Sequence, residues 1–128
     1  MKKIDVVCVI LQNENNQLLI AKRKSQVADG IWEFPGGKVE PDETKGAACI
    51  RECREELSVD IEIDRFLMDF HDDAFSDDIH VFAYAAHIIG GTIAYQAHYE
   101  GAWVTRSQLY DYTFQKADRC LLDYLQNH

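Results

Sequence analysis

The stretch Ala48-Cys-Ile-Arg-Glu-Cys-Arg-Glu-Glu-Leu57 places three glutamates on one helical face. Glu52, Glu55 and Glu56 stand three and four residues apart, and residues at these spacings are neighbours on an α-helix. Three carboxylates in one place repel one another and add no stability by themselves. An ordinary solvated helix surface is one interpretation, since glutamate is a good helix former. Glu55 and Glu56 lie near the carboxyl end, where the helix macrodipole disfavours negative charge, and this favours a cluster that binds a cation.

A glycine turn and one further acid precede this helix. After Gly37 the sequence has five residues, Glu43, seven residues, and then the run Arg51-Glu-Cys-Arg-Glu-Glu-Leu-Ser-Val59. These 23 positions closely resemble the Nudix signature, in which a glycine, a glutamate and an Arg-Glu-apolar-x-Glu-Glu-x-Gly-apolar segment form a loop, a helix and a second loop. Cys53 replaces an aliphatic residue of that pattern and Ser58 replaces a glycine. A left-handed backbone at Ser58 costs on the order of 1 kcal/mol, which predicts a slightly different helix end.

The order of strand and helix patterns predicts the fold class. Residues rich in Val and Ile indicate strands at Ile4–Leu11 and Gln17–Arg23, which residues 12–16 join into a β-hairpin. Further strands are expected at Ile31–Phe34, Ile61–His71, Ile79–Ile89 and Trp103–Val104. Helices are expected from an N-cap at Asp42 to about Leu57, and over Gln115–Gln126. Loops or turns are expected at residues 25–30, 35–37 and 72–78.

These elements and the resemblance together imply the Nudix fold. This is an α/β (α+β) arrangement, a mixed β-sheet sandwiched between helices, with the signature forming a loop-helix-loop. We expect a single domain over residues 1–128, as a monomer or homodimer.

Composition restricts the partners and the compartment. Against 13 Lys and Arg stand 22 Asp and Glu, a net charge of −9 that argues against binding a nucleic-acid polymer. No stretch approaches the roughly 20 apolar residues of a membrane span. The start Met-Lys-Lys-Ile-Asp-Val has an acid where a signal peptide is apolar, so we expect a cytoplasmic protein. The four cysteines are interpreted as small apolar core residues.

The acidic cluster suits a particular chemistry. Hydrolysis of a diphosphate linkage brings water to a polyanion, and divalent cations with oxygen ligands neutralise the charge and activate the water. Mg²⁺ is the expected cofactor, and Mn²⁺ fits the same ligands. The resemblance implies that the Gly36 carbonyl and the carboxylates of Glu52, Glu55 and Glu56 bind metal or activate water. Among these, Glu56 is the expected metal ligand, and Glu52 is a ligand or the general base.

Of three further charged residues, Arg51 and Glu100 have two interpretations each and Glu43 has one. By resemblance Arg51 is catalytic and orients the acids, but an ion pair with Glu55 within the helix explains it equally. Glu43 pairs with the Arg51 guanidinium in the structural interpretation. Glu100, just before a tryptophan, completes the metal site in similar proteins, and a solvated loop acid is the alternative.

Residues outside the signature resemble the MutT type of small nucleoside triphosphate pyrophosphohydrolases. They are Met1–Ile4, Asn13–Asn16, Arg23 and Trp32-Glu33-Phe34-Pro35-Gly36-Gly37-Lys38. The resemblance implies that Arg23, Glu33, Phe34, Pro35 and Gly36 line the site of a small-molecule nucleoside triphosphate. A surface arginine beside a strand-turn packing unit is the alternative.

Asp118 lies where MutT-type enzymes read the base edge. An ionised aspartate only accepts hydrogen bonds, so it favours an amino group such as N4 of cytosine, whereas a helix N-terminal acid is the structural alternative. We therefore expect metal-dependent hydrolysis of CTP, another pyrimidine triphosphate or 8-oxo-dGTP to the monophosphate and pyrophosphate. A nucleotide-sensing module without turnover, and a Nudix hydrolase of another nucleoside diphosphate-linked substrate, are the alternatives.

Overall fold

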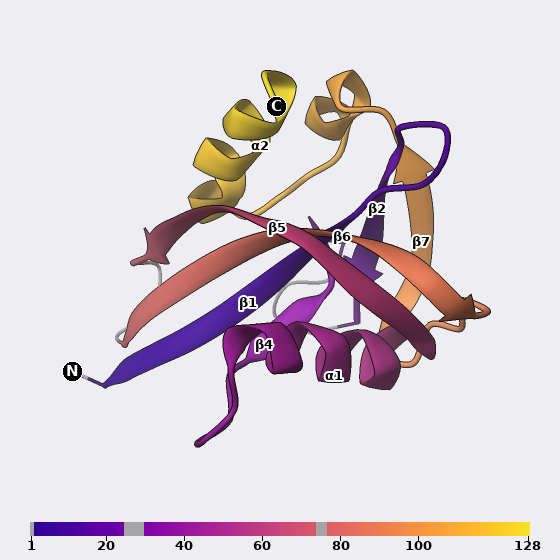
Figure 1. Ribbon diagram of the computed structural model, residues 1–128. Helices are drawn as coiled ribbons and strands as arrows, with labels where there is room; N and C mark the ends of the chain where they lie inside the picture. The colour runs from indigo at the N-terminus through magenta and orange to yellow at the C-terminus, as the bar shows by residue number, and fades with distance from the viewer. Residues whose placement is uncertain (1, 25–29, 74–76) are drawn as a thin grey trace.

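The computed structural model describes residues 2–24, 30–73 and 77–128 (Figure 1). Its strands are β1 Lys3–Leu11, β2 Leu18–Arg23, β3 Trp32–Glu33, β4 Gly36–Lys38, β5 Val59–Asp72, β6 Asp78–Gly91 and β7 His98–Val104. Its helices are α1 Lys45–Leu57 and α2 Arg119–Gln126, with short 3-10 helices at Ser107–Asp111 and Lys116–Asp118. The loop expected at residues 25–30 and the turn expected at 72–78 extend outside the described residues.

The strands divide into two sheets instead of forming the single sheet that was expected. One sheet has the order β4-β1-β6-β5 and the other β3-β2-β7. β1 pairs in parallel with β6, and the other pairings are antiparallel, so the first sheet is mixed as predicted.

The predicted hairpin between β1 and β2 is wrong in its pairing. β4 and β6 already occupy the two edges of β1, so β2 has no edge of β1 to join. A single bridge between Gln12 and Leu18 remains beside the turn, and β2 then pairs with β3 and β7. The Asn13 side chain holds this turn by accepting hydrogen bonds from the backbone N–H groups of Asn15 and Gln17.

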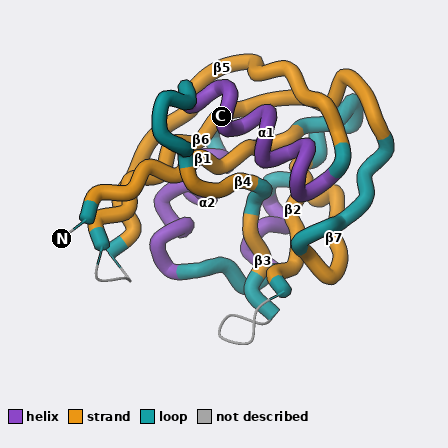
Figure 2. The backbone as a smooth tube through the Cα atoms, turned by 90° about the horizontal axis from the view of Figure 1, so that it is seen from below, coloured by secondary structure: helices purple, strands orange, loops and turns teal. Residues whose placement is uncertain are grey.

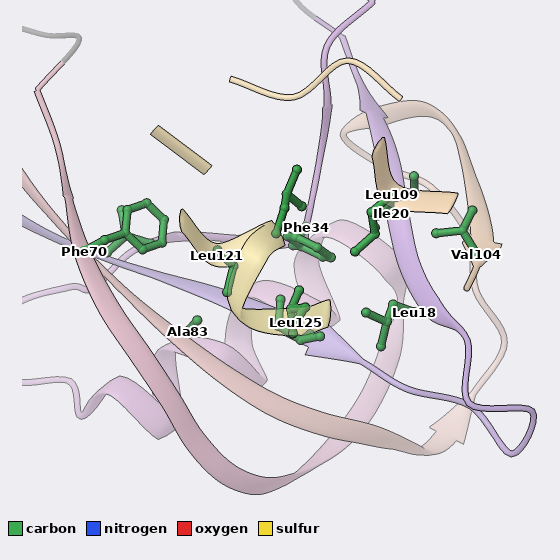
Figure 3. Packing of buried hydrophobic residues seen from close by; sticks show 12 residues of the cluster. Leu18, Ile20, Phe34, Phe70, Ala83, Val104, Leu109, Leu121 and Leu125 are labelled. Carbon is green, nitrogen blue, oxygen red and sulfur yellow. The ribbon is translucent and has the colours of Figure 1, made fainter. Parts of the chain in front are cut away.

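Helices α1 and α2 cover opposite faces of the four-stranded sheet (Figure 1), as the prediction of a sheet between helices requires. Successive residues of a strand point to opposite faces. On β1, Val7, Val9 and Leu11 accordingly pack on the α1 side, whereas Ile10 packs on the α2 side. The α1 side also buries Ala48, Cys49, Cys53 and Leu57 of the helix itself. On the other side, Leu121 and Leu125 of α2 pack with Phe34 and Phe70 (Figure 3).

Helix α1 begins at a different cap from the one predicted. Thr44 is the N-cap, and its Oγ1 accepts a hydrogen bond of 3.1 Å from the N–H of Ala47. Asp42 has a φ of 64°, so it lies in the preceding turn. That turn is closed by the N–H of Glu43, which donates to the Glu40 carbonyl. The turn places the cap two residues later than composition alone suggested.

The carboxyl end of α1 is closed by Ser58 and by the segment between β6 and β7. Ser58 adopts the left-handed conformation with φ 61° and ψ 33°, and its N–H donates to the Arg54 carbonyl. The predicted difference at this helix end is therefore absent, because serine takes the conformation that glycine would take. The N–H groups of Ala94 and Gln96 donate, each at 2.9 Å, to the Leu57 and Glu56 carbonyls. Figure 2 views the molecule from the α1 side.

Other boundaries differ modestly from the predictions. β5 starts at Val59 and β7 at His98, both before the expected residues, and α2 starts at Arg119 after a 3-10 turn. Cys49 and Cys53 are buried as expected, whereas Cys120 is exposed because Leu121 and Leu122 take the inner face of α2. In the described parts of the chain, no helix has the length and apolar character needed to cross a membrane.

Candidate active site

Two of the three signature glutamates point at adjacent glycines of β4. The Gly36 N–H donates to Glu56 Oε1 at 2.9 Å. A Cβ on Gly37 would lie 2.6 Å from Glu52 Cδ, so only glycine leaves room for that carboxylate. A Cβ on Gly36 would lie 2.0 Å from the Val7 carbonyl oxygen, so this glycine also permits the pairing of β4 with β1. The side chains of Glu52 and Glu56 therefore converge over one point of the sheet.

The third signature glutamate differs in its surroundings. Glu55 has 59% of its side chain exposed, compared with 14% for Glu52. Its contact in the structure is Arg51 Nη1, which donates to Glu55 Oε2 at 3.2 Å. Glu55 therefore stands at the solvent rim of the acidic face.

Arg51 links the signature acids to one another. Its Nε and Nη2 form a two-pronged hydrogen bond to Glu43 at 2.7 and 2.9 Å, and its Nη1 donates to Glu52 at 2.9 Å. Nη2 also donates to the Lys38 carbonyl at 2.9 Å, which ties the guanidinium to β4. The contact with Arg51 lowers the pKa of Glu43 to about 2. Arg51 thus makes both proposed contacts, the ion pair with Glu55 and the orienting bond to Glu52.

Burial disfavours the ionised forms of both Glu52 and Glu56. Burial raises the pKa of Glu56 to about 7, and the neighbouring carboxylates of Glu52 and Glu33 add to this effect. Burial also raises the pKa of Glu52, although Arg51 opposes the shift. A metal ion bound here would displace the proton that Glu56 carries at lower pH.

His98 is a site residue that the sequence did not reveal. It is 2% exposed, and its Nε2 lies 2.8 Å from Glu33 Oε2, where the ring N–H donates to the carboxylate. Burial raises the pKa of Glu33, but the hydrogen bonds from His98 and Arg23 outweigh burial and lower it overall. Ligand atoms of Glu33, Glu56 and His98 all lie within 4.8 Å of one another, so these residues could also hold a metal ion. His98 lies five residues before the short strand expected at Trp103–Val104, and β7 extends back to include it.

Glu100 occupies a different position from the acids of α1. It is exposed on β7, in register with Lys22 of β2. His98, two residues earlier, is the β7 side chain that reaches Glu33. A metal-binding role for Glu100 stays a prediction.

A cavity of about 260 Å³ adjoins the acidic pair. Five of the six residues expected to contact substrate line it, namely Arg23, Glu33, Phe34, Gly36 and Asp118. Pro35 is buried beside the cavity, and its carbonyl accepts a hydrogen bond from the Val9 N–H. The cavity wall also includes Cys8, Asp72, Ile79, Val81 and Gln115, which the sequence did not indicate. Arg23 forms an ion pair with Glu33 at this wall.

Asp118 contributes a carboxyl group to this cavity. It is the N-cap residue of α2, but its side chain makes no capping hydrogen bond. Burial raises its pKa to about 6, and the charges of Asp72 and Glu33 add to the effect while Arg23 opposes it. Asp118 therefore lies at the N-terminus of α2, as the structural alternative of an acid stabilised by the helix dipole requires, and it also lines the cavity, so base reading stays a prediction.

The fold and the paired acids define a class of protein. The NUDIX domain family matches residues 1–125, and the chain belongs to this family. It is therefore a NUDIX hydrolase, an enzyme of the class that acts on acid anhydrides, and such hydrolases generally use divalent metal ions.

Several relatives resemble most or half of the chain. The CTP pyrophosphohydrolase of Escherichia coli (strain K12) is 33% identical over 124 residues, which cover 96% of this chain and 91% of that protein. The 8-oxo-dGTP diphosphatase of Proteus vulgaris is 40% identical over 62 residues, covering 47% of this chain and 54% of that protein. The solution structure of the E. coli ORF135 protein has a TM-score of 0.85 at 32% identity, covering 98% of this chain and 90% of that chain.

Proposed function

We propose that this enzyme hydrolyses a nucleoside triphosphate, with CTP as the first candidate, to the monophosphate and pyrophosphate with Mg²⁺. The observation that carries this proposal is that Glu52 and Glu56 contact two glycines of a cavity that Asp118 also lines. The acids are suited to the phosphates and the cavity to the base.

The side chains at the acidic pair fit a hard divalent cation. Glu52 and Glu56 offer carboxylate oxygens, the ligand type that Mg²⁺ and Mn²⁺ prefer. Their like charges and partial burial are unfavourable until a cation is present. When bound, such a cation neutralises phosphate charge and lowers the pKa of a coordinated water.

The chain's own residues have separable roles in this proposal. Arg51 fixes the Glu52 carboxylate through Nη1, which keeps that group ready to accept a proton from the attacking water. Glu56 is held by the Gly36 N–H through one oxygen, so its other oxygen is available to the cation. Arg23, at the cavity wall, supplies positive charge for the phosphates.

The choice of CTP rests on the cavity and on one relative. Asp118 accepts hydrogen bonds when ionised, and cytosine offers an amino group where uracil offers a carbonyl. The relative named for CTP aligns over 96% of this chain, and the relatives named for 8-oxo-dGTP over 46% to 80%. The first fact supports CTP over UTP, and the second supports CTP over 8-oxo-dGTP.

Hydrolysis assays with purified protein test the proposal. We expect pyrophosphate release from CTP with Mg²⁺, slower release from UTP and 8-oxo-dGTP, and none after chelation. The Glu56→Gln variant in the same assays excludes a contaminating phosphatase. Absence of pyrophosphate release from every triphosphate would overturn the proposal.

A further inference from the structure

We propose that Asp72 is a second base-reading residue, which together with Asp118 binds the 4-amino group of cytosine. This inference rests on the proposed function, since it specifies how the same cavity selects its base. Asp72 belongs to neither the signature nor the MutT-like segments.

Its position in the fold brings Asp72 to the cavity. It is the last residue of β5, in register with Ile79 of β6, and it is 8% exposed. Asp72, Asp118 and Ile79 line the same cavity, so a carboxylate from β5 and one from α2 face a common space. The Asp72 charge is the largest of the neighbouring charges that raise the pKa of Asp118, which indicates that the two carboxylates are close.

Two carboxylates match an amino group better than one does. The exocyclic N4 of cytosine has two N–H donors, and each can reach a different carboxylate, which at neutral pH is an acceptor only. Uracil has a carbonyl oxygen at the same place, and two carboxylates facing that oxygen repel it and leave it without a donor. A well-made pair of hydrogen bonds to a base edge gives about 1–3 kcal/mol of discrimination, or roughly 10- to 100-fold.

The rest of the cavity suits a pyrimidine ring. Phe34, Ile79 and Val81 provide apolar surface for its faces. Gln115 also lines the cavity, and its amide can donate to the N3 or O2 acceptors of cytosine. Arg23 lies at the same wall, where it is paired with Glu33.

The test compares Asp72→Asn with Asp73→Asn. Asp73 is the next residue and is exposed, and it is absent from the residues that line this cavity, so it controls for the loss of one local charge. The substrates are CTP, UTP, 8-oxo-dGTP and the CTP analogue whose pyrimidin-2-one base lacks the 4-amino group. We measure kcat/KM for each in all variants, together with thermal melting.

We expect the wild type to prefer CTP over the analogue by about 100-fold, and Asp72→Asn by about 10-fold. Asp73→Asn should retain the wild-type ratio. In Asp72→Asn, kcat/KM for UTP should rise relative to kcat/KM for CTP, because the asparagine amide can donate to the uracil carbonyl. If the melting curve shows that Asp72→Asn is unfolded, Asp72→Ser provides a smaller uncharged variant for the same ratios.

Three outcomes overturn the inference in distinguishable ways. If CTP is hydrolysed and Asp72→Asn retains the wild-type ratio, Asp72 does not read the base and the proposed function stands. If CTP is not hydrolysed at all, the proposed function and this inference are both wrong. If Asp72→Asn lowers kcat/KM for 8-oxo-dGTP but not for CTP, the pair reads a guanine edge, which also contradicts the assignment.

Discussion

On the α1 side of the sheet, the acids come from one helix and face two adjacent glycines. On the α2 side, the cavity is lined by residues from all of β1 to β6 and by Gln115 and Asp118 just before α2, so its wall joins segments that are far apart in the chain. The first group is proposed to act on phosphates that every triphosphate has, and the second on the base that differs between them. From these proposed roles we expect that catalysis and the choice of base can be altered separately.

Glu56→Gln tests this separation with the largest expected effect. Loss of one ionised oxygen ligand should lower kcat by on the order of 10²–10³-fold, as for the removal of a preorganised electrostatic contact. The decrease should be the same for CTP and UTP, because the acid serves the phosphates. Glu62→Gln, on the exposed surface of β5, is the control and should retain wild-type kcat. Unequal decreases for the two substrates would contradict the proposal that Glu56 acts only on the phosphates.

Asp118→Ala tests the other side. Removing the acceptor should lower kcat/KM for CTP by roughly 10- to 100-fold, and for UTP by much less. Asp111→Ala is a suitable control, since Asp111 is an exposed acid at the end of the first 3-10 helix. Equal decreases in kcat/KM for both substrates would show that Asp118 does not distinguish the two bases.

Arg51→Lys sharpens the description of the α1 side. Lysine keeps the positive charge, but it cannot form the bidentate hydrogen bond to Glu43 and at the same time donate to Glu52. We therefore expect kcat to fall about tenfold for both substrates. Arg54→Lys is a matched control on the same helix, because Arg54 is 63% exposed and pairs with Asp60. An unchanged kcat in Arg51→Lys would show that charge alone suffices.

The preference for CTP over UTP should depend on pH. With a pKa of about 6, Asp118 is ionised at pH 7 and accepts from an amino group, whereas at pH 5 it is protonated and can donate to a carbonyl. The ratio of kcat/KM values should therefore fall severalfold from pH 7 to pH 5. Titration of Glu56 should change kcat/KM for both substrates by the same factor, so it cancels in the ratio. Asp118→Asn should make the ratio independent of pH, and a pH-dependent ratio in that variant would contradict this assignment.

Ser58→Gly should have the smallest effect. Glycine accepts the left-handed conformation at this position without the strain of serine, which predicts a gain of about 1 kcal/mol in the free energy of unfolding. Ser107→Gly is the control, since this exposed serine lies within a 3-10 helix. Denaturant unfolding measures both. No gain in Ser58→Gly would indicate that the contact of Ser58 Oγ with Gln96 Nε2 compensates for the strain.

The same contrast explains what the sequence could predict. The acids of α1 and the turn at Gly36 were predictable, because helical spacing and glycine stereochemistry act over a few residues. His98 and Asp72 were not, because their roles depend on which strands lie next to one another. The pairing of β2 with β7 brings His98 into register with Arg23, and no local pattern specifies that pairing. The hairpin prediction was wrong for the same reason, because β4 and β6 pair with the two edges of β1.

The segment between β6 and β7 also determines where the chain can be lengthened. Its N–H groups at Ala94 and Gln96 satisfy the last carbonyls of α1, one of which belongs to Glu56. An inserted tag or fluorescent label within residues 92–97 would move these donors and release the helix end that holds the acid. The turn at residues 12–17 carries exposed Glu14 and Asn15 and touches neither the acids nor the cavity. Fusion partners and circular permutation should therefore be directed to that turn.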